Sequence, residues 1–265
     1  MFQEKVVWIT GASSGIGEAI AIEMAAEGAR LILSARREAE LERVKASCVS
    51  AGAAPDDIFV LTLDVTDEAA MADKVSQAHS KWGSIDMLLN NAGISQRSLC
   101  VDTDMATYRT LFDVDVFGQI ALTKQVLPIM IEQGTGHLAV TASVAGKIGA
   151  SKRTGYCAAK HAMMGFFDAL RTEVTKQGIQ VTTITPGFIR TAVSENALNG
   201  DGTVFGEMDK SIAGGMDVTK CAKVIMQGFK KGKYEIPVGE GIEMKALLIK
   251  RFFPNRLFKM VEKIG

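Results

Sequence analysis

The sequence TGASSGIG, from Thr10 to Gly17, decides the fold of this chain. It directly follows the apolar run Val6–Ile9 and precedes a stretch whose apolar residues recur at helical spacing. Glycines between a strand and a helix supply positive φ angles and let the backbone approach a pyrophosphate, while the free N–H groups of the helix N-terminus favour an anion. The loop is therefore either a plain turn or a dinucleotide phosphate site. Its loose glycine spacing alone does not decide between the two.

Short apolar or β-branched runs alternate with longer amphipathic stretches along the chain. The runs predict buried strands at Lys5–Thr10, Arg30–Ala35, Ile58–Leu63, Ile85–Asn90, His137–Thr141, Ile179–Thr185 and Tyr234–Val238. The amphipathic stretches predict helices at Gly15–Gly28, Glu38–Ala51, Asp67–Trp82, Asp104–Glu132 and Thr154–Gln177. This alternation indicates an α/β fold, a Rossmann-type doubly wound parallel sheet of about seven strands with helices on both faces.

Residues 1–265 show no linker, repeat or low-complexity tract, so we expect a single domain. After Pro186 the periodicity weakens and Gly, Asn, Ser and Asp become frequent. Since this weakly periodic segment is long for a plain loop, we predict that residues 190–217 form a lid over a substrate cleft.

The composition is that of an ordinary globular protein. Lys and Arg total 30 and balance 30 acidic residues, so no basic field favours nucleic acid. The four cysteines form no close pair, and the three histidines have no metal-ligand spacing, so neither a disulfide framework nor a metal site is expected. Because no signal peptide is evident, we expect a cytoplasmic protein.

The end of the second predicted strand indicates which dinucleotide is bound. Dinucleotide folds that prefer NAD commonly carry an acid at this point, which accepts hydrogen bonds from the ribose hydroxyls. Here the strand ends Ser34-Ala35-Arg36-Arg37, without an acid. The Arg36 guanidinium can form a bidentate pair with a 2′-phosphate, whereas Arg37 is read as a solvated start to the next helix. NADP(H) is therefore favoured over NAD(H).

Three further residues suit acid–base chemistry. Tyr156 and Lys160 are four residues apart in a predicted helix and so share one face. A neighbouring ammonium favours the phenolate and brings the pKa of a phenol toward the working range. Ser143 follows the strand His137–Thr141, at the carboxyl end where ligands bind in parallel sheets. A tyrosine and a lysine at this spacing are common by chance, so the inference depends on the coincidence with Ser143.

Together these residues resemble the short-chain dehydrogenase/reductase family. The resemblance covers nearly the whole chain and rests on six motifs in the family's order: Thr10-Gly11-x-x-x-Gly15-x-Gly17, Leu63-Asp64-Val65, Asn90-Asn91-Ala92-Gly93, Ser143, Tyr156-x-x-x-Lys160 and Pro186-Gly187-x-x-x-Thr191. It implies hydride transfer between nicotinamide and the carbon of a small-molecule alcohol or carbonyl compound.

The resemblance also implies roles for the matching residues. Tyr156 corresponds to the general acid in reduction and base in oxidation, Ser143 to the donor that orients the substrate oxygen, and Lys160 to the residue that holds the nicotinamide ribose. Together with Arg36, the remaining positions are expected to bind the cofactor: Gly11, Ser13, Ser14, Gly15, Ile16, Gly17, Asp64, Val65, Asn91, Ala92, Gly93, Pro186, Gly187, Ile189 and Thr191.

One position departs from the family pattern. Many members carry an asparagine 28 residues before the serine, where it helps maintain a water-linked proton path to the lysine; here that position is Asp115. An ionised aspartate accepts hydrogen bonds but cannot donate them. If ionised, Asp115 can pair with Lys160, directly or through water, and we expect an altered proton relay rather than a loss of activity.

The last segment, residues 242–265, is basic and apolar and is interrupted by Pro254. It could make weak contact with an anionic membrane surface, pack over the substrate mouth or meet a partner subunit. Members of the family usually assemble through their two long helices, here Asp104–Glu132 and Thr154–Gln177, which implies a homodimer or homotetramer.

Three functions stay open on the sequence. The leading one is an NADP(H)-dependent oxidoreductase acting on a secondary alcohol or ketone. Asp115 leaves room for a nucleotide-binding sensor or scaffold with impaired catalysis. A reductase of 3-oxoacyl thioesters is a third possibility, although no acyl-carrier docking patch is evident.

Overall fold

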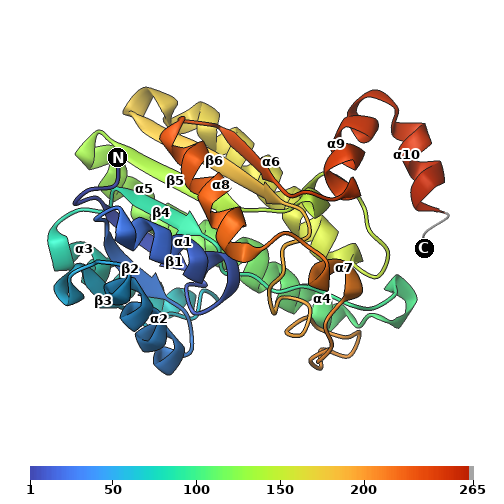
Figure 1. The fold of residues 1–265 in the computed structure, drawn as a ribbon, viewed down its shortest axis with the longest axis horizontal. Helices are drawn as coiled ribbons and strands as arrows, with labels where there is room; N and C mark the ends of the chain where they lie inside the picture. Colours follow the sequence, from blue (N-terminus) through green and yellow to red (C-terminus); the bar gives the residue numbers. More distant parts are fainter. Residues whose placement is uncertain (263–265) are drawn as a thin grey trace.

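The computed structural model describes residues 1–262, and its centre is one parallel sheet (Figure 1). The strands are β1 (Val6–Thr10), β2 (Arg30–Ser34), β3 (Ile58–Val60), β4 (Met87–Asn90), β5 (Gly136–Thr141), β6 (Ile179–Pro186) and β7 (Glu235–Val238). Their order in the seven-stranded sheet is β3-β2-β1-β4-β5-β6-β7. The predicted fold class is therefore confirmed. The chain adds β2 and β3 on one side of β1 and then β4 to β7 on the other side, and such sheets bind ligands at the switch point between β1 and β4.

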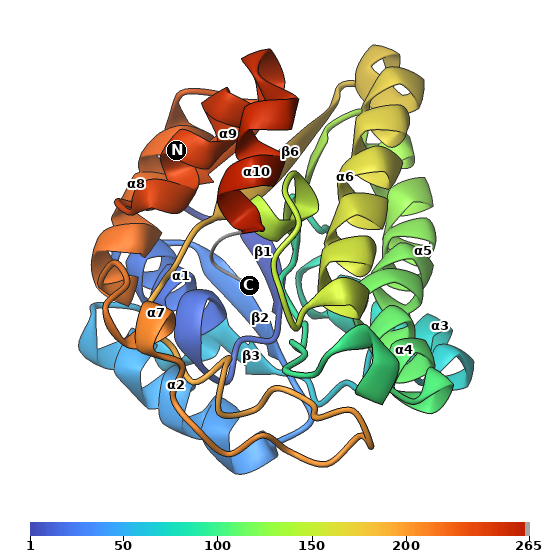
Figure 2. The same cartoon turned by 90° about the vertical axis from the view of Figure 1, so that its right-hand side faces the viewer.

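The sheet is buried on both faces because consecutive strand residues point to opposite sides. In β1, Val7 and Ile9 join the core on one face, and Val6 and Trp8 join the core on the other. The first core is covered by α1 (Gly15–Ala26), α2 (Glu38–Ser50) and α8 (Val218–Lys230), and the second by α3 (Glu68–Trp82), α5 (Gly118–Gln133) and α6 (Thr154–Val174). Figure 2 shows these two helix layers on either side of the sheet.

The long helix predicted at Asp104–Glu132 is divided by a π-helical turn. It consists of α4 (Met105–Phe112), the π turn η3 (Asp113–Phe117) and α5. The prediction of one regular helix was therefore wrong at its centre. Single π turns are uncommon and often occur at functional sites, and this one contains the buried Asp115.

The stretch Met105–Gln133 is the one described helix that is long and apolar enough to span a membrane by length and composition. Its inner face packs in the protein core, where Leu122, Val126 and Met130 are fully buried. Packing on the sheet accounts for this apolar face.

Short helical turns and the C-terminal helices complete the fold. The turns are η1 (Pro55–Asp57), η2 (Cys100–Asp102), η4 (Val144–Gly146), η5 (Thr175–Gln177) and α7 (Lys210–Ala213). The chain then ends in α9 (Ile242–Phe252) and α10 (Pro254–Val261), which stand away from the body of the molecule in Figure 1. Pro254 separates the two helices, as the sequence predicted; residues 263–265 of the predicted C-terminal segment lie outside the described residues.

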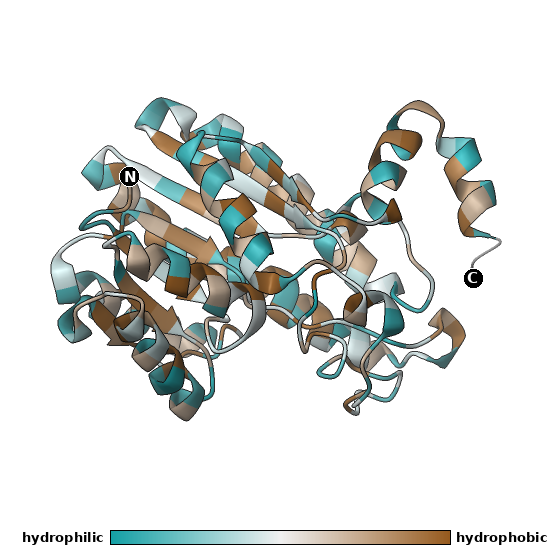
Figure 3. Ribbon diagram, in the orientation of Figure 1, coloured by the Kyte–Doolittle hydropathy of each residue, from teal (hydrophilic) through white to brown (hydrophobic). Residues whose placement is uncertain are grey.

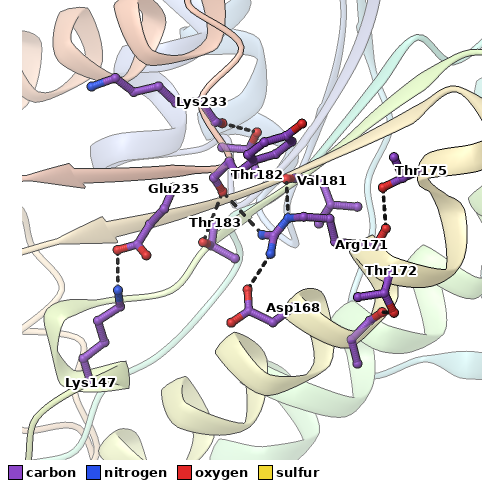
Figure 4. Close-up of polar contacts among 12 residues, drawn as sticks. Lys147, Asp168, Arg171, Thr172, Thr175, Val181, Thr182, Thr183, Lys233 and Glu235 are labelled. Atoms are coloured by element: carbon purple, nitrogen blue, oxygen red, sulfur yellow. Dashed lines mark hydrogen bonds and ion pairs between the residues drawn. The ribbon is translucent and has the colours of Figure 1, made fainter. Parts of the chain in front are cut away.

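Hydrogen bonds and an ion pair of polar side chains connect β6 and β7 to neighbouring elements (Figure 4). Arg171 of α6 donates to the carbonyls of Val181, at 3.1 Å, and Tyr234, at 3.4 Å, and so links the helix to β6 and to the residue that precedes β7. Lys147, just after η4, forms an ion pair with Glu235 of β7. The loop that follows Ser143 is thereby fastened to the edge of the sheet.

Candidate active site

The glycine loop joins β1 to α1 and turns tightly against the end of β4. Gly11 and Gly15 have φ angles of +63° and +60°, which favour glycine. A Cβ on Gly11 would lie 2.8 Å from Cα of Ala92, so no side chain fits between the two loops. Ser14 caps α1 without a side-chain hydrogen bond, which leaves the first N–H groups of the helix open to an anion.

Asn91 holds the glycine loop in place. Its Nδ2 donates to the carbonyls of Thr10, at 3.1 Å, and Gly11, at 3.3 Å, while its Oδ1 accepts from Oγ1 of Thr141 at 3.0 Å. The side chain therefore links the ends of β1, β4 and β5. The polar atoms of the Asn91 side chain thus have partners within the protein. Its direct contact with the cofactor ribose stays a prediction.

Arg36 and Arg37 follow β2, and both line the same cleft as the glycine loop. Arg36 is exposed and forms no ion pair with the described residues, so its guanidinium is available to a ligand. Arg37 is exposed at the start of α2, as the sequence predicted, and it also lines the cleft beside Arg36.

Ser143 lies directly after β5, where the strand leaves the sheet. Its Oγ accepts a hydrogen bond from the N–H of Ala145 at 3.0 Å and donates to the carbonyl of Pro186 at 3.4 Å. Because the second of these bonds is long, the hydroxyl hydrogen can turn toward a substrate oxygen. Ser143 thus meets the Pro186–Gly187 turn of the neighbouring strand β6.

Tyr156 and Lys160 lie on the first two turns of α6, facing the cleft. The Lys160 ammonium lies 5.6 Å from the centroid of the Tyr156 ring and donates to the carbonyl of Thr141 at 3.2 Å. Tyr156 is partly exposed, whereas Lys160 is almost fully buried. The ammonium can therefore act on the phenol while the phenol reaches a bound substrate.

Asp115 has no exposed surface and projects from the π turn toward Lys160. Its Oδ1 accepts from the N–H of Ile94 at 2.7 Å. Its Oδ2 lies 3.3 Å from Nζ of Lys160, close enough for an ion pair although the two atoms are not aligned as a hydrogen bond. The predicted pairing of Asp115 with Lys160 is therefore present.

Burial and pairing act in opposite directions on the two charges. Burial raises the pKa of Asp115 above its usual value, and the Lys160 ammonium and the Ile94 N–H offset only part of that rise. For Lys160, burial is the largest single effect and lowers the pKa, but Asp115 and Tyr156 together raise it by more, so that its pKa lies above the usual value. Asp115 thus helps to keep the buried lysine protonated.

A single cleft of about 690 Å³ gathers the predicted site. Every residue named from the sequence lines it except Gly17 and Asp115, which lie behind its wall. A Cβ on Gly17 would lie 2.4 Å from the carbonyl oxygen of Gly11, so Gly17 serves the close packing of α1 against the loop. Asp64, Val65, Ile189 and Thr191 line the cleft together with the glycine loop.

Several residues of segment 190–217, the predicted lid, line the cleft. Leu198 pairs with the stretch after β4, since its N–H donates to the Ser95 carbonyl and its carbonyl accepts from the N–H of Arg97, both at 2.8 Å. Leu198, Val204 and Ile212 line the cleft.

Sequence reasoning missed several residues at the cleft. Glu243, buried at the start of α9, accepts from the N–H of Phe188 at 3.2 Å, so the C-terminal segment packs against the Pro186–Gly187 turn. Arg97 and Arg153 line the cleft near Tyr156 and share the carboxylate of Asp209. No motif marks these residues, because their partners are distant in the sequence.

Within residues 1–262, no group of three or more His, Cys, Asp or Glu side chains is arranged to hold a metal ion. The polar groups around Tyr156 are instead hydroxyls, one ammonium and two guanidinium groups. The site is therefore equipped for proton transfer and anion binding by side chains.

Comparisons with known proteins agree with this geometry. The family model of short chain dehydrogenases matches residues 5–201. Dehydrogenase/reductase SDR family member 7 of Homo sapiens is 39% identical over 266 residues, which covers 99% of this chain and 78% of the human protein.

Solved structures give the same result for the fold. A short chain dehydrogenase/reductase from Burkholderia phymatum in complex with NAD has a TM-score of 0.82 at 23% identity and covers 98% of this chain and 95% of that one. A metagenomic short-chain oxidoreductase in complex with NADP has a TM-score of 0.66 at 28% identity and covers 70% of this chain and 83% of that one. Among similar proteins, therefore, both dinucleotides are found.

Proposed function

The chain belongs to the short-chain dehydrogenase family, and from this premise we propose that it is an NADP(H)-dependent oxidoreductase acting on a secondary alcohol or ketone. Members of the family are oxidoreductases that use a nicotinamide cofactor. One observation carries the finer proposal: Ser143, Tyr156 and Lys160 line the same cleft as the glycine loop and Arg36. A cofactor held by that loop would reach the three polar groups along the same cleft.

The cleft fits a dinucleotide. The space beside Gly11 is too tight for a side chain, Gly15 has a positive φ angle that favours glycine, and the N-terminus of α1 offers N–H groups without a side-chain cap. Arg43 supports this loop from α2, since it donates to the carbonyl of Ser13 at 3.3 Å and pairs with Glu18. When bound, the nicotinamide would donate or accept a hydride at the substrate carbon.

The preference for NADP(H) rests on Arg36. Its guanidinium is exposed, has no acidic partner among residues 1–262 and lies at the end of β2. A 2′-phosphate there gains charge-assisted hydrogen bonds, whereas a carboxylate that would favour NAD(H) is lacking at the strand end. Arg37 adds a second positive charge beside it.

The protein's own residues would control the proton. In reduction, Tyr156 donates its phenolic proton to the substrate oxygen; in oxidation, its phenolate accepts the proton from the alcohol. Ser143 would donate a hydrogen bond to the same oxygen and fix its position. Lys160 would stabilise the phenolate and hold the ribose with a remaining N–H, because one of its three donors already binds Thr141.

Two variants test the proposal. Arg36→Glu should weaken NADPH binding by about 100-fold while leaving NADH binding within a few-fold, because it removes charge-assisted hydrogen bonds to the phosphate only. Tyr156→Phe should still bind NADPH but should lose at least about 100-fold in turnover of ketones, since it lacks the proton donor. Cofactor binding is measured by calorimetry and turnover by NADPH consumption across a ketone panel.

The same experiment separates the alternatives. A nucleotide-binding sensor or scaffold would bind NADPH tightly with no turnover that depends on Tyr156. A 3-oxoacyl thioester reductase would act on the thioester and discriminate strongly against simple ketones. Intact Ser143, Tyr156 and Lys160 at one cleft support the oxidoreductase over the sensor.

We also propose a homodimer or homotetramer, since members of this family commonly form oligomers. Met105, Phe117 and Ile131, on the long helix Met105–Gln133, expose 60%, 53% and 44% of their surface. Such large apolar side chains favour burial against a second copy. Light scattering after gel filtration gives the number of copies, and Phe117→Asp would then shift the protein toward the monomer.

The proposal places the protein in the cytoplasm, in weak contact with an anionic membrane surface through α9 and α10. Figure 3 shows apolar and polar residues alternating along both helices. Phe252, Phe253 and Phe258 are more than half exposed, next to basic residues of the same helices. The full chain should sediment with anionic liposomes, whereas a protein of residues 1–241 should stay in the supernatant. Equal sedimentation of the two proteins would overturn this proposal.

A further inference from the structure

The substrate end of the cleft carries positive charge that the proposed reaction does not use. The whole chain is electrically balanced, yet five basic side chains line the cleft against two acidic ones, namely Arg36, Arg37, Arg97, Arg153 and Lys160 against Asp64 and Glu243. Arg36 and Arg37 follow β2 at the adenosine side, and Lys160 is paired with Asp115. Arg97 and Arg153 are thus left without a role in binding the cofactor or moving the proton.

Arg97 is held rigidly with part of its guanidinium unused. Its side chain is 6% exposed, and Nη1 donates to Oγ of Ser95 at 2.9 Å and to the carbonyl of Gln96 at 2.7 Å. Nε is buried without a hydrogen bond and already faces a carboxylate, since it lies 3.3 Å from Oδ2 of Asp209. Nη2 makes no hydrogen bond with the described residues and is therefore the donor of Arg97 that a further carboxylate can bind.

Arg153 brings a second guanidinium to the same place. It immediately precedes α6, three residues before Tyr156, so the two residues are about one helical turn apart. Its Nη2 donates to Oδ2 of Asp209 at 2.8 Å, and the same oxygen lies 3.3 Å from Nε of Arg97. One carboxylate between two guanidinium groups leaves one positive charge uncompensated.

The surroundings of Arg97 disfavour its positive charge. Burial lowers the pKa of Arg97 below its usual value, and repulsion from Arg153 lowers it further, while Asp209 offsets part of the effect. Asp209 belongs to the predicted lid and is itself held by the N–H of Ser211. A second anion at this pair would balance the charge and use the free donors.

We propose that Arg97 and Arg153 bind a carboxylate of the substrate, so that this enzyme acts on an oxo acid or a hydroxy acid. This inference rests on the proposed function, because the reacting carbon must lie beside Ser143 and Tyr156 in the same cleft. The single remaining positive charge matches a carboxylate, which carries one negative charge, better than a phosphate, which carries nearly two. Asp209, which belongs to the predicted lid, contacts both guanidinium groups and holds Arg97 and Arg153 near each other.

Matched substrates test this assignment. The protein should reduce an oxo acid with a higher kcat/KM than the corresponding methyl ester or amide. Arg97→Gln should lower kcat/KM for the acid by about 10- to 100-fold, mainly through KM, because it loses hydrogen bonds to a charged group. The ester should change by no more than a few-fold. Arg109→Gln is the control, since Arg109 is exposed on α4 and does not line the cleft.

A purely structural role gives a different result. If Arg97 and Arg153 only fasten the lid through Asp209, then Arg97→Gln lowers kcat/KM equally for the acid and the ester, and the inference is overturned. Arg153→Gln provides a second variant in case the buried Arg97 is needed for folding, and the same selective loss is expected.

Binding without turnover separates this inference from the proposed function. Tyr156→Phe protein loaded with NADPH should bind a saturated monocarboxylate more tightly than its amide, as measured by calorimetry, and Arg97→Gln should abolish the difference. Turnover of neutral ketones that depends on Tyr156, with no preference for acids, would overturn the carboxylate site alone. Carboxylate binding without any turnover that depends on Tyr156 would contradict the proposed function and leave the site standing.

Discussion

At the scale of single residues, the pair Asp115–Lys160 distinguishes this site from the family pattern. Asp115 is fully buried, accepts from the N–H of Ile94 and lies 3.3 Å from the Lys160 ammonium. An asparagine of the same shape could accept from Ile94 but would carry no charge. The aspartate therefore raises the pKa of Lys160 and competes with Tyr156 for its ammonium.

Asp115→Asn should move the pH profile of alcohol oxidation to lower pH by about one unit. Without the carboxylate, burial lowers the pKa of Lys160, which moves the alkaline limb downward. The profile of kcat/KM against pH measures this shift.

Asp113→Asn serves as the matched control, because Asp113 lies in the same π turn but is exposed. If Asp115→Asn leaves both the profile and the rate unchanged, its side chain takes little part in the reaction.

His137 predicts how stability depends on pH. It is buried on β5, its Nε2 is hydrogen-bonded to Oγ1 of Thr182 at 2.9 Å, and burial lowers its pKa from 6.5 to about 4. The unfolded state therefore binds a proton more readily, so this contribution to stability is complete above about pH 6.5 and is lost as the pH falls toward about 4.

The corresponding experiment compares urea unfolding of the protein with that of His137→Gln. Between neutral pH and about pH 5, the natural protein should lose about 2 kcal/mol more of its unfolding free energy than the variant, because glutamine does not titrate. Parallel losses in the two proteins would show that His137 titrates normally.

Among the secondary-structure elements, the alternation of apolar runs and amphipathic stretches predicted all seven strands. It missed the π turn within the long helix. Strands buried on both faces are continuous apolar runs, which makes them easy to locate. The π turn Asp113–Phe117 does not interrupt the apolar spacing of the long helix, so periodicity predicts a regular helix there. The turn is recognisable only in three dimensions, from the way in which it aims Asp115 at Lys160.

The close packing of α1 on its own loop gives a test at this scale. Gly17→Ala should destabilise the fold by about 1–3 kcal/mol and weaken NADPH binding, because its Cβ would lie 2.4 Å from the Gly11 carbonyl oxygen and 2.5 Å from Asn91 Nδ2. Gly165→Ala, in α6, is the matched control. Its Cβ would meet nothing within 4 Å, so it should stabilise the protein by up to about 1 kcal/mol.

Thermal or urea unfolding measures both variants, and calorimetry measures the binding of NADPH. Equal stabilisation by the two alanines would mean that the glycine loop can move away from α1 at little cost.

At the scale of the whole molecule, the predictable part of the site is the part that short motifs encode. Gly11, Ser143 and Tyr156 line one cleft because the carboxyl ends of parallel strands meet at one edge of the sheet. The Arg97–Arg153–Asp209 cluster brings together three segments with no shared motif, so nothing in their order indicates a contact. Its assembly depends on the path of segment 190–217 over the cleft.

The proposed function has a hydride pass from NADPH to a carbonyl carbon in the cleft, with Tyr156 as the proton donor. The most direct test supplies NADPH carrying deuterium on one or the other face of the nicotinamide ring and analyses the alcohol product by mass spectrometry. Deuterium should reach the former carbonyl carbon from one face only, and Tyr156→Phe should suppress the transfer. Transfer from both faces, or transfer that persists in Tyr156→Phe at the natural rate, would contradict the account.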